Sequence, residues 1–366
     1  MLAIARGEWQ LPIAAATTIA FVLFGDGWLG DLASPTWYTI MLAWLFAAIM
    51  ACAFAVVRHA EALAERLGEP FGTLVLTLSM SGMEMMMISA VMLAGHGSAT
   101  LARDTMLAIV MIVLNGLVGT CLLAGGLRYH EQTYNLYSAN SFLAVILPLA
   151  VLGLVLPGFT VTTPGPTLST LQSVFLIFMS VVLYVVFLGI QTLRHREYFI
   201  DPDAAPHDAS HAEHASGSTA LHAAMLIAYA IPIVLLAKQI AKPIDYGIAV
   251  LGAPAPLGGL LVAVLILAPE SMAAVRAALA NRLQRSINVA LGTALSSIGL
   301  TIPAVLVIGF LTHQQIVLGL APVDIVLLLL TLVVSMLTFA LARTNVLLGA
   351  VHLLLFVAYL VFIVEK

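Results

Sequence analysis

Two long apolar stretches of this chain each contain a single acidic residue. Residues 71–95 carry Glu84 and residues 257–275 carry Glu270, and neither stretch has another Asp, Glu, Lys or Arg. A membrane-spanning helix needs about 20 consecutive apolar residues, so each stretch is long enough to cross a bilayer. A charge at the bilayer centre costs at least about 2.5–3.5 kcal/mol, and ionisable residues there are functional candidates by default. The two glutamates therefore constrain both the fold and the function.

The composition agrees with a chain that is embedded in a lipid bilayer. Apolar residues make up 62% of it and charged residues 9%, whereas soluble domains have about 25% charged residues. The formal net charge of −4 argues against a nucleic-acid partner. Cys52 and Cys121 lie far apart in apolar segments, which excludes a disulfide framework. We predict an all-α polytopic membrane protein, with no indication of its oligomeric state.

Apolar runs separated by Gly, Pro and charged clusters predict about eleven transmembrane helices. The first is expected to be a retained signal anchor, because no small-residue cleavage site follows it. In the eighth, Gly and Pro interrupt the first turns, so its membrane portion is expected to begin near Leu257. The predicted helices span residues 11–31, 37–57, 71–95, 105–127, 140–157, 170–193, 220–239, 247–275, 287–312, 322–341 and 345–364.

A polar segment rich in His and acidic residues, 194–218, divides the chain. We expect an extra N-terminal helix within 1–35, a first five-helix repeat over 36–193, the hydrophilic loop over 194–218, and a second five-helix repeat over 219–366. Because five is odd, the repeats cross the membrane in opposite directions, which is the topology of inverted repeats. Glu84 and Glu270 both fall in the second helix of their repeat.

The distribution of basic residues predicts the orientation in the membrane. Of the 14 Lys and Arg residues, ten fall on the side of the N-terminus, and the four on the other side are Arg103, Lys238, Lys242 and Lys366. Basic residues concentrate on the cytoplasmic side. We therefore expect a multi-pass protein of the bacterial inner membrane with a cytoplasmic N-terminus, a cytoplasmic loop at 194–218 and the C-terminus outside.

The surroundings of both glutamates offer oxygen atoms. Ser81 lies three residues before Glu84 and hence on the same helical face. Pro269 precedes Glu270 and has no N–H, which leaves one backbone carbonyl a turn earlier without its helical partner. Two carboxylates beside neutral oxygens suit Ca²⁺, which takes about 6–8 oxygen ligands. The pattern predicts that Glu84 and Glu270 meet and bind a cation.

The helices that follow each glutamate carry further polar residues, of which we select Asn115, Thr293 and Ser296, with Ser81, as supporting ligands. When the cation leaves, two adjacent carboxylates in a low dielectric take up protons. Competition between cation and protons is by itself an antiport mechanism. A purely structural role is the alternative, in which each glutamate pairs with Arg or is held protonated by a serine. The spans have no basic residue at a similar depth, which argues against it.

Several segments resemble those of a known family. These segments are residues 58–61, 66–70, the Glu84 helix, 103–105, the Pro269-Glu270 helix, 284–295 and 343–347. On these residues the chain resembles the bacterial ChaA-type calcium/proton antiporters of the cation/calcium exchanger superfamily. The resemblance covers nearly the whole chain from about Arg58. It implies an extra N-terminal helix, two inverted five-helix repeats joined by a hydrophilic cytoplasmic loop, and Glu84 and Glu270 as alternating ligands of the cation and the proton.

The chain departs from this family before each glutamate. Members commonly have Gly-Asn there, whereas this chain has Met80-Ser81 and Leu267-Ala268. The side-chain amide ligands that the resemblance implies are therefore absent at these positions. For this reason exchange of Na⁺ or K⁺ stays open beside exchange of Ca²⁺.

We predict a proton-coupled antiporter that exports Ca²⁺ in exchange for H⁺, with Na⁺/H⁺ or K⁺/H⁺ antiport as the alternative on the same fold. The metal ligands are Glu84 and Glu270, and the cation is cargo, so no resident cofactor is expected. An intramembrane enzyme would need a GxGD pair or a zinc ligand set, neither of which the sequence contains. A channel would conduct cations without coupled proton movement.

Three other polar features have structural interpretations. The charged residues between 58 and 69 are expected to anchor a helix end at the interface and pair within the helix, with gating as the alternative. The His-rich loop is expected to be a solvated linker, with sensing of metal or pH as the alternative. His352, in the last span, is expected to be packed or hydrogen-bonded.

Overall fold

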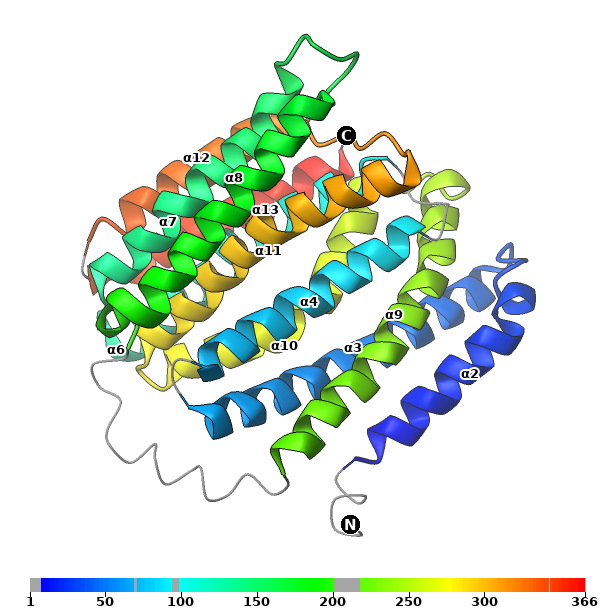
Figure 1. Cartoon of the computed structure of the whole chain (residues 1–366), viewed down its shortest axis with the longest axis horizontal. Coiled ribbons are helices and arrows are strands. Elements are labelled where there is room, and N and C mark those ends of the chain that lie inside the picture. Colours follow the sequence, from blue (N-terminus) through cyan, green and yellow to red (C-terminus); the bar gives the residue numbers. More distant parts are fainter. Residues whose placement is uncertain (1–7, 69–70, 94–98, 201–217, 342, 366) are drawn as a thin grey trace. The chain divides into compact units, whose positions relative to one another are not determined.

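The computed structural model describes residues 8–68, 71–93, 99–200, 218–341 and 343–365 (Figure 1). Most of the His-rich loop, residues 201–217, lies outside the described residues, as does the C-terminal Lys366. Within the described part, ten helices are long and apolar enough to span a membrane, and one further apolar helix, Pro322–Thr338, is shorter. The all-α polytopic prediction is confirmed, with an N-terminal helix followed by five helices in each half.

Every predicted span has its counterpart among these helices. The N-terminal helix is α2 (Gln10–Trp28). The first two spans of the first half are α3 (Pro35–Leu67) and α4 (Phe71–Leu93). The third span consists of α5 (Leu101–Val110), η1 (Met111–Leu117) and α6 (Val118–Tyr129), and the fourth of α7 (Leu136–Ala150), η2 (Val151–Val155) and η3 (Leu156–Gly158). The fifth span consists of α8 (Thr170–Gly189) and η4 (Ile190–Arg194). After η5 (Arg196–Tyr198), the second half contains α9 (Thr219–Ala249), α10 (Pro256–Leu279), α11 (Leu283–Thr312), α12 (Pro322–Thr338) and α13 (Val346–Val364).

Two predicted boundaries need correction. The seventh span does not end at 239, because α9 continues to Ala249 through Pro243 and Lys242. Lys242 does not interrupt the helix, since its ammonium group binds Asp26 of α2 at 2.5 Å. The eighth span accordingly begins at Pro256 rather than at 247, close to the position where its membrane portion was expected.

The chain folds into two compact units that are not its two sequence halves. The first unit contains residues 1–98 and 205–258, and the second contains residues 99–204 and 259–366. In the first unit α3 and α9, the first helices of the two halves, lie side by side, and both also contact α2 and α4 (Figure 1). The first unit therefore combines corresponding helices of both halves around one interface.

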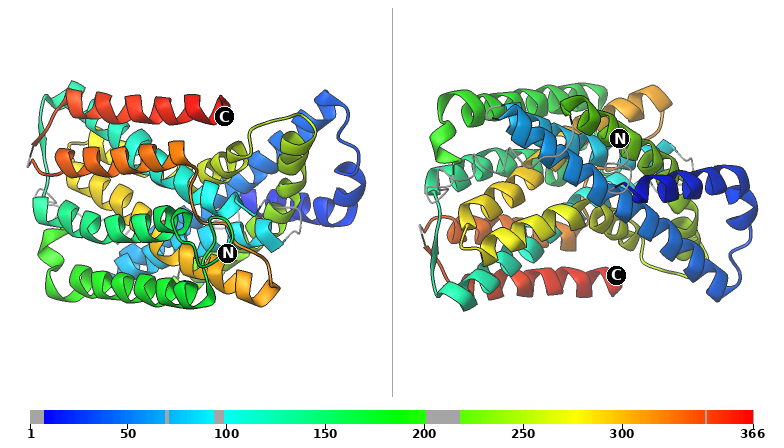
Figure 2. Two further views of the ribbon diagram at one scale, coloured as in Figure 1. Left: turned by 90° about the horizontal axis from the view of Figure 1, so that it is seen from above. Right: turned by 90° about the horizontal axis from the view of Figure 1, so that it is seen from below.

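The second unit shows the same exchange of partners between the two halves. The α8 helix packs against α11, and α13 packs against α6 and η1, so the third helix of each half contacts the fifth helix of the other. The α12 and α13 helices also run beside each other (Figure 2). This reciprocal packing is the arrangement that inverted repeats produce.

Small residues bring α6 and α13 close together. A Cβ atom on Gly349 would lie 2.9 Å from the carbonyl oxygen of Gly119, and one on Gly119 would lie 2.9 Å from the backbone nitrogen of Leu353. Such contacts are typical of membrane helices, where packing rather than water exclusion drives association. A short ribbon ties the ends of these helices, with β1 (Gln132–Thr133) pairing antiparallel with β2 (Arg343–Thr344).

Candidate functional site

Glu270 lies in the second unit, and its side chain has a defined partner. The residue is 8% exposed, and Thr293 of α11 donates a hydrogen bond from its Oγ1 to the Oε2 of Glu270. The α10 helix runs through Pro269 without a break, so the missing N–H changes only the local hydrogen bonding one turn before the glutamate. Ser286 fixes α11 beside α10 by donating to the carbonyl of Ala274 at 2.7 Å. The tertiary fold thus brings two of the predicted site residues together.

Glu84 lies in the first unit, in the middle of a continuous helix. It is 2% exposed, as is Ser81, three residues earlier on the same face of α4. Within the described residues the Oγ of Ser81 has no hydrogen-bond partner. A buried hydroxyl without a partner loses its hydration without compensation, so it is available to a ligand. The α4 helix continues without a break through Gly82.

The other two predicted ligands have partners of their own. Ser296 donates from its Oγ to the carbonyl of Thr293, 3.1 Å away and one turn earlier. Asn115 lies in the π-helical segment η1 and is completely buried. Its amide nitrogen donates to Thr331 Oγ1 at 2.7 Å, and its amide oxygen contacts the Nδ1 of His352 at 3.1 Å. Neither contact joins Asn115 to Glu270 or Thr293.

The Asn115 contacts belong to a buried polar network in the second unit. His352 is completely buried, and its Nε2 lies 3.0 Å from the Oγ1 of Thr338. The expectation that His352 is hydrogen-bonded is confirmed. The sequence does not reveal Thr331 and Thr338 as its partners, because each is one of many hydroxyl residues in apolar helices. Their role in the structure is to satisfy buried polar groups that would otherwise cost stability.

A buried ion pair to which the sequence assigns no role lies near the start of α5. Asp104 is 2% exposed, and its carboxylate accepts from Arg103 at 2.9 Å and from Thr100 at 2.9 Å. Arg103 also donates to the carbonyl of Gly319 at 3.0 Å. The signal for this pair in the sequence is the adjacent Arg and Asp of the 103–105 segment. Because the carboxylate is matched by a guanidinium, we assign the pair to positioning of the 313–321 connection.

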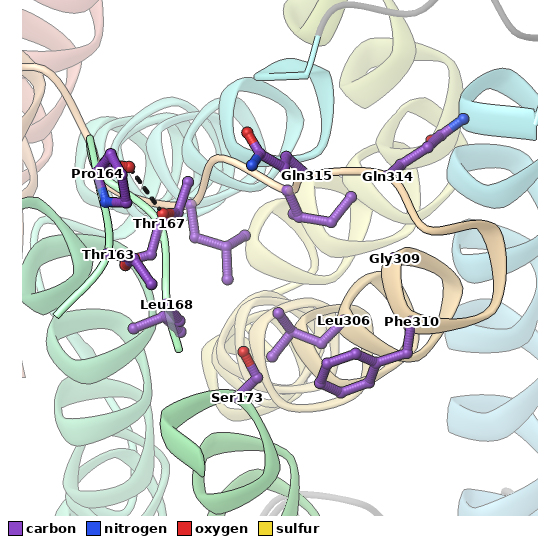
Figure 3. A pocket seen from close by; sticks show the side chains of 12 residues that line it. Thr163, Pro164, Thr167, Leu168, Ser173, Leu306, Gly309, Phe310, Gln314 and Gln315 are labelled. Atoms are coloured by element: carbon purple, nitrogen blue, oxygen red, sulfur yellow. Dashed lines mark hydrogen bonds between the residues drawn. The ribbon is translucent and has the colours of Figure 1, made fainter. Parts of the chain in front are cut away.

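The second unit also contains a pocket with a volume of about 200 Å³ (Figure 3). It lies between the connection after η3 and the connection after α11, and Thr163, Thr167, Gln314 and Gln315 line it together with apolar side chains. It has no charged lining residue and includes none of the predicted ligands. Among the residues that the structure describes, no three His, Cys, Asp or Glu side chains gather as a metal site.

The sequence matches a known protein family over most of its length. The model of the sodium/calcium exchanger protein family matches this chain twice, at residues 37–193 and 221–365. The chain belongs to this family. One buried glutamate of this exchanger falls within each matched segment, Glu84 in the first and Glu270 in the second.

Individual relatives agree with the family. A Sinorhizobium fredii protein named as an ionic transporter, y4hA, is 41% identical over 359 residues, which is 96% of this exchanger and 94% of the relative. The sodium-potassium/proton antiporter ChaA of Escherichia coli is 40% identical over 315 residues, which is 85% of each chain. A crystal structure of the Ca²⁺/H⁺ antiporter YfkE has a TM-score of 0.72 at 19% identity and covers 97% of this chain and 99% of that one. The last likeness establishes the fold.

Proposed function

We propose that this exchanger is a proton-coupled cation antiporter in which Glu84 and Glu270 bind the same cation and compete for it with protons. Two buried carboxylates support this proposal, one in each family match, and Glu270 already accepts a hydrogen bond from Thr293. A hydrogen bond to a carboxylate stabilises its charged form, which is the form that holds a cation. The predicted orientation places proton entry outside and cation uptake in the cytoplasm.

The exchange cycle follows from the electrostatics of two carboxylates in a low dielectric. With a cation bound, both carboxylates stay ionised and Ser81 and Thr293 add neutral oxygens. After the cation leaves toward the outside, the two negative charges repel each other and are poorly solvated, so protons bind in its place. The protons leave toward the cytoplasm, and the charged pair binds the next cation. The inward proton gradient thereby drives cation export.

The primary substrate that we propose is Ca²⁺. Two negative charges and hard oxygen atoms match its preference for oxygen ligands. Methionine sulfur atoms neighbour Glu84 in the sequence, at Met83 and Met85, but a carboxylate is a hard ligand that suits Ca²⁺ better than a soft metal. The proposed supporting oxygens are hydroxyls rather than amides.

Na⁺/H⁺ or K⁺/H⁺ antiport is the second candidate, and two observations favour it. The E. coli relative at 40% identity is named a sodium-potassium/proton antiporter. The chain also has Ser81 and Ala268 where the resemblance implies side-chain amides. Fewer strong ligands suit a monovalent ion that needs less charge compensation.

The experiment is a proton-release assay in proteoliposomes that contain a pH-sensitive dye. After the lumen is acidified, Ca²⁺, Na⁺ and K⁺ are added in turn. Alkalinisation by micromolar Ca²⁺ supports the first candidate, and a response only to millimolar Na⁺ or K⁺ supports the second. No response to any of the three contradicts proton-coupled antiport.

The roles of the two glutamates are tested by Glu84→Gln and Glu270→Gln. Each is expected to abolish exchange while the protein still elutes as a folded species from a sizing column. Glu131→Gln is the matched control, because the Glu131 side chain is 57% exposed and faces Arg343. Calorimetry then separates one shared site from two, since a shared site loses all binding in either variant. If each variant keeps half of the bound cation, the shared site is wrong.

A further inference from the structure

A cluster of buried titratable groups lies in the first unit, away from the proposed transport carboxylates. His59 of α3 and His222 of α9 are 4% and 8% exposed. Their Nδ1 atoms lie 3.0 Å apart, and their ring centroids are 5.2 Å apart. Two imidazoles at hydrogen-bond distance join the two helices that form the main interface of this unit.

A carboxylate from the segment before α2 completes the cluster. The Oε2 of Glu8 lies 2.7 Å from Arg58, accepts a hydrogen bond from Tyr229 at 2.8 Å, and lies 3.4 Å from the Nε2 of His59. Burial raises the pKa of Glu8, but the Tyr229 hydrogen bond and the Arg58 charge outweigh it and hold the pKa below its usual range. Glu8 is therefore a fixed negative charge beside His59 at neutral pH.

The geometry determines how many protons the pair can hold. A hydrogen bond between two Nδ1 atoms needs one N–H and one lone pair, so the contact exists when one of the two nitrogens is unprotonated. The carboxylate of Glu8 favours a proton on the Nε2 of His59, which leaves the Nε2 of His222 buried and without a partner in the described structure. The pair can accept one proton with its contact intact. A second proton would set two N–H groups against each other and separate α3 from α9.

The other elements packed around the pair add few charges. The α2 helix contributes Asp26, which is bound to Lys242, and α4 contributes Glu84. Glu8 contacts His59, the Tyr229 ring stacks on that of His59, and Arg58 acts through its ion pair with Glu8. The α3 helix also carries Glu61, Glu65 and Arg66 within two turns of His59. Imidazole titrates within the physiological range, so small changes in these neighbours move its titration across that range.

We propose that the His59–His222 pair, with Glu8, is a second proton-binding site of this exchanger, through which cytoplasmic pH regulates exchange. Its regulatory role rests on the proposed function, whereas its proton binding does not. One proton strengthens the link between the N-terminal segment, α3 and α9, and full protonation breaks it. The predicted orientation places this end of α3 and α9 at the cytoplasmic face.

The pair is displaced along the helix from the transport carboxylate of the same unit. The α3 and α4 helices are antiparallel, and a Cβ on Gly72 would contact the backbone of Ala64. Counting from that contact places position 52 of α3 at the level of Glu84. His59 is seven residues further along, which is about 10 Å at the rise of an α-helix. The pair is therefore a site of its own.

The first test observes the protons directly, without any transport. Histidine-labelled protein in nanodiscs is titrated by nitrogen-15 NMR, and wild type, His59→Gln and His222→Gln are compared. Coupled groups titrate as a pair. We expect each variant to lose its own signal and also to shift the midpoint of the remaining partner by about one pH unit. An unchanged partner in both variants overturns the proposal. His130→Gln is the control, because His130 is exposed, and it should leave both signals unchanged.

The second test concerns regulation and uses two opposite charge changes outside the proposed transport site. Removing the negative charge in Glu8→Gln should move the cytoplasmic pH of half-maximal exchange downward, and removing the positive charge in Arg58→Gln should move it upward, by about one unit each. Shifts in the same direction, or none, refute the regulatory role. If wild type shows no exchange at all, the proposed function fails, while the NMR result still decides whether the pair binds protons.

Discussion

Replacing Thr293 by valine tests the most specific contact at the proposed cation site. The substitution keeps the shape of the side chain and removes the hydroxyl that donates to Glu270. A hydrogen bond to a charged group contributes about 1.5–3 kcal/mol. The hydrogen bond favours the ionised carboxylate that the cation needs, so its loss favours the protonated form. At about 1.4 kcal/mol per tenfold change, the cation concentration for half-maximal exchange should rise about 10- to 100-fold.

The assay is cation-dependent proton release from proteoliposomes, measured over a range of cation concentrations at fixed pH. Two variants serve as controls. Thr293→Ser keeps the hydroxyl and should stay within about threefold of wild type, since it changes the local free energy by less than about 0.7 kcal/mol. Thr312→Val removes a hydroxyl at the other end of α11 that donates to the backbone carbonyl of Ile308 at 2.8 Å, and it should have a small effect. An unchanged concentration dependence in Thr293→Val would refute the role of this hydroxyl.

Three further predictions concern packing and pH. Gly349→Ala places a methyl group against the backbone of α6 and should lower the free energy of unfolding by about 1–3 kcal/mol in a detergent melt; an unchanged melt would contradict the close α6–α13 contact. Gly82→Ala meets no atom within 4 Å, so it should stabilise α4 by about 0.5–1 kcal/mol, and slower exchange in the same variant would indicate that the helix must flex there. The pKa of Glu8 is lower in the folded protein than its unfolded value of 4.5, so ionised Glu8 stabilises the fold above pH 4.5, and this stabilisation is lost as pH falls through the folded pKa. The difference in unfolding free energy between wild type and Glu8→Gln should therefore narrow on acidification. A difference that stays constant with pH would contradict the lowered pKa of Glu8.

The sequence was sufficient to predict the membrane helices and the two buried glutamates. A bilayer excludes unpaired backbone groups, so apolar stretches of sufficient length become helices irrespective of their neighbours. The same reasoning makes a single carboxylate within such a stretch conspicuous. Where charges lie near a helix end, this logic fails. The α9 helix continues past Lys242 because that side chain binds Asp26, a residue 216 positions away.

The partners of polar side chains were decided by the tertiary structure. Asn115 and Thr293 look alike from the sequence, since each is a polar residue in the helix that follows a glutamate. In the folded protein Thr293 donates a hydrogen bond to Glu270, whereas Asn115 contacts Thr331 and His352. Helical periodicity gives the relative direction of residues on one helix, but the neighbour that each face meets depends on how distant helices pack.

Hydropathy and charge act locally along the chain, so the sequence alone is enough to predict many membrane crossings and two intramembrane carboxylates. The contacts between distant polar side chains depend instead on the tertiary structure. His59 and His222 are 163 residues apart and lie in different halves, yet their Nδ1 atoms are 3.0 Å apart. No spacing in the sequence encodes that distance, which results from the packing of α3 against α9.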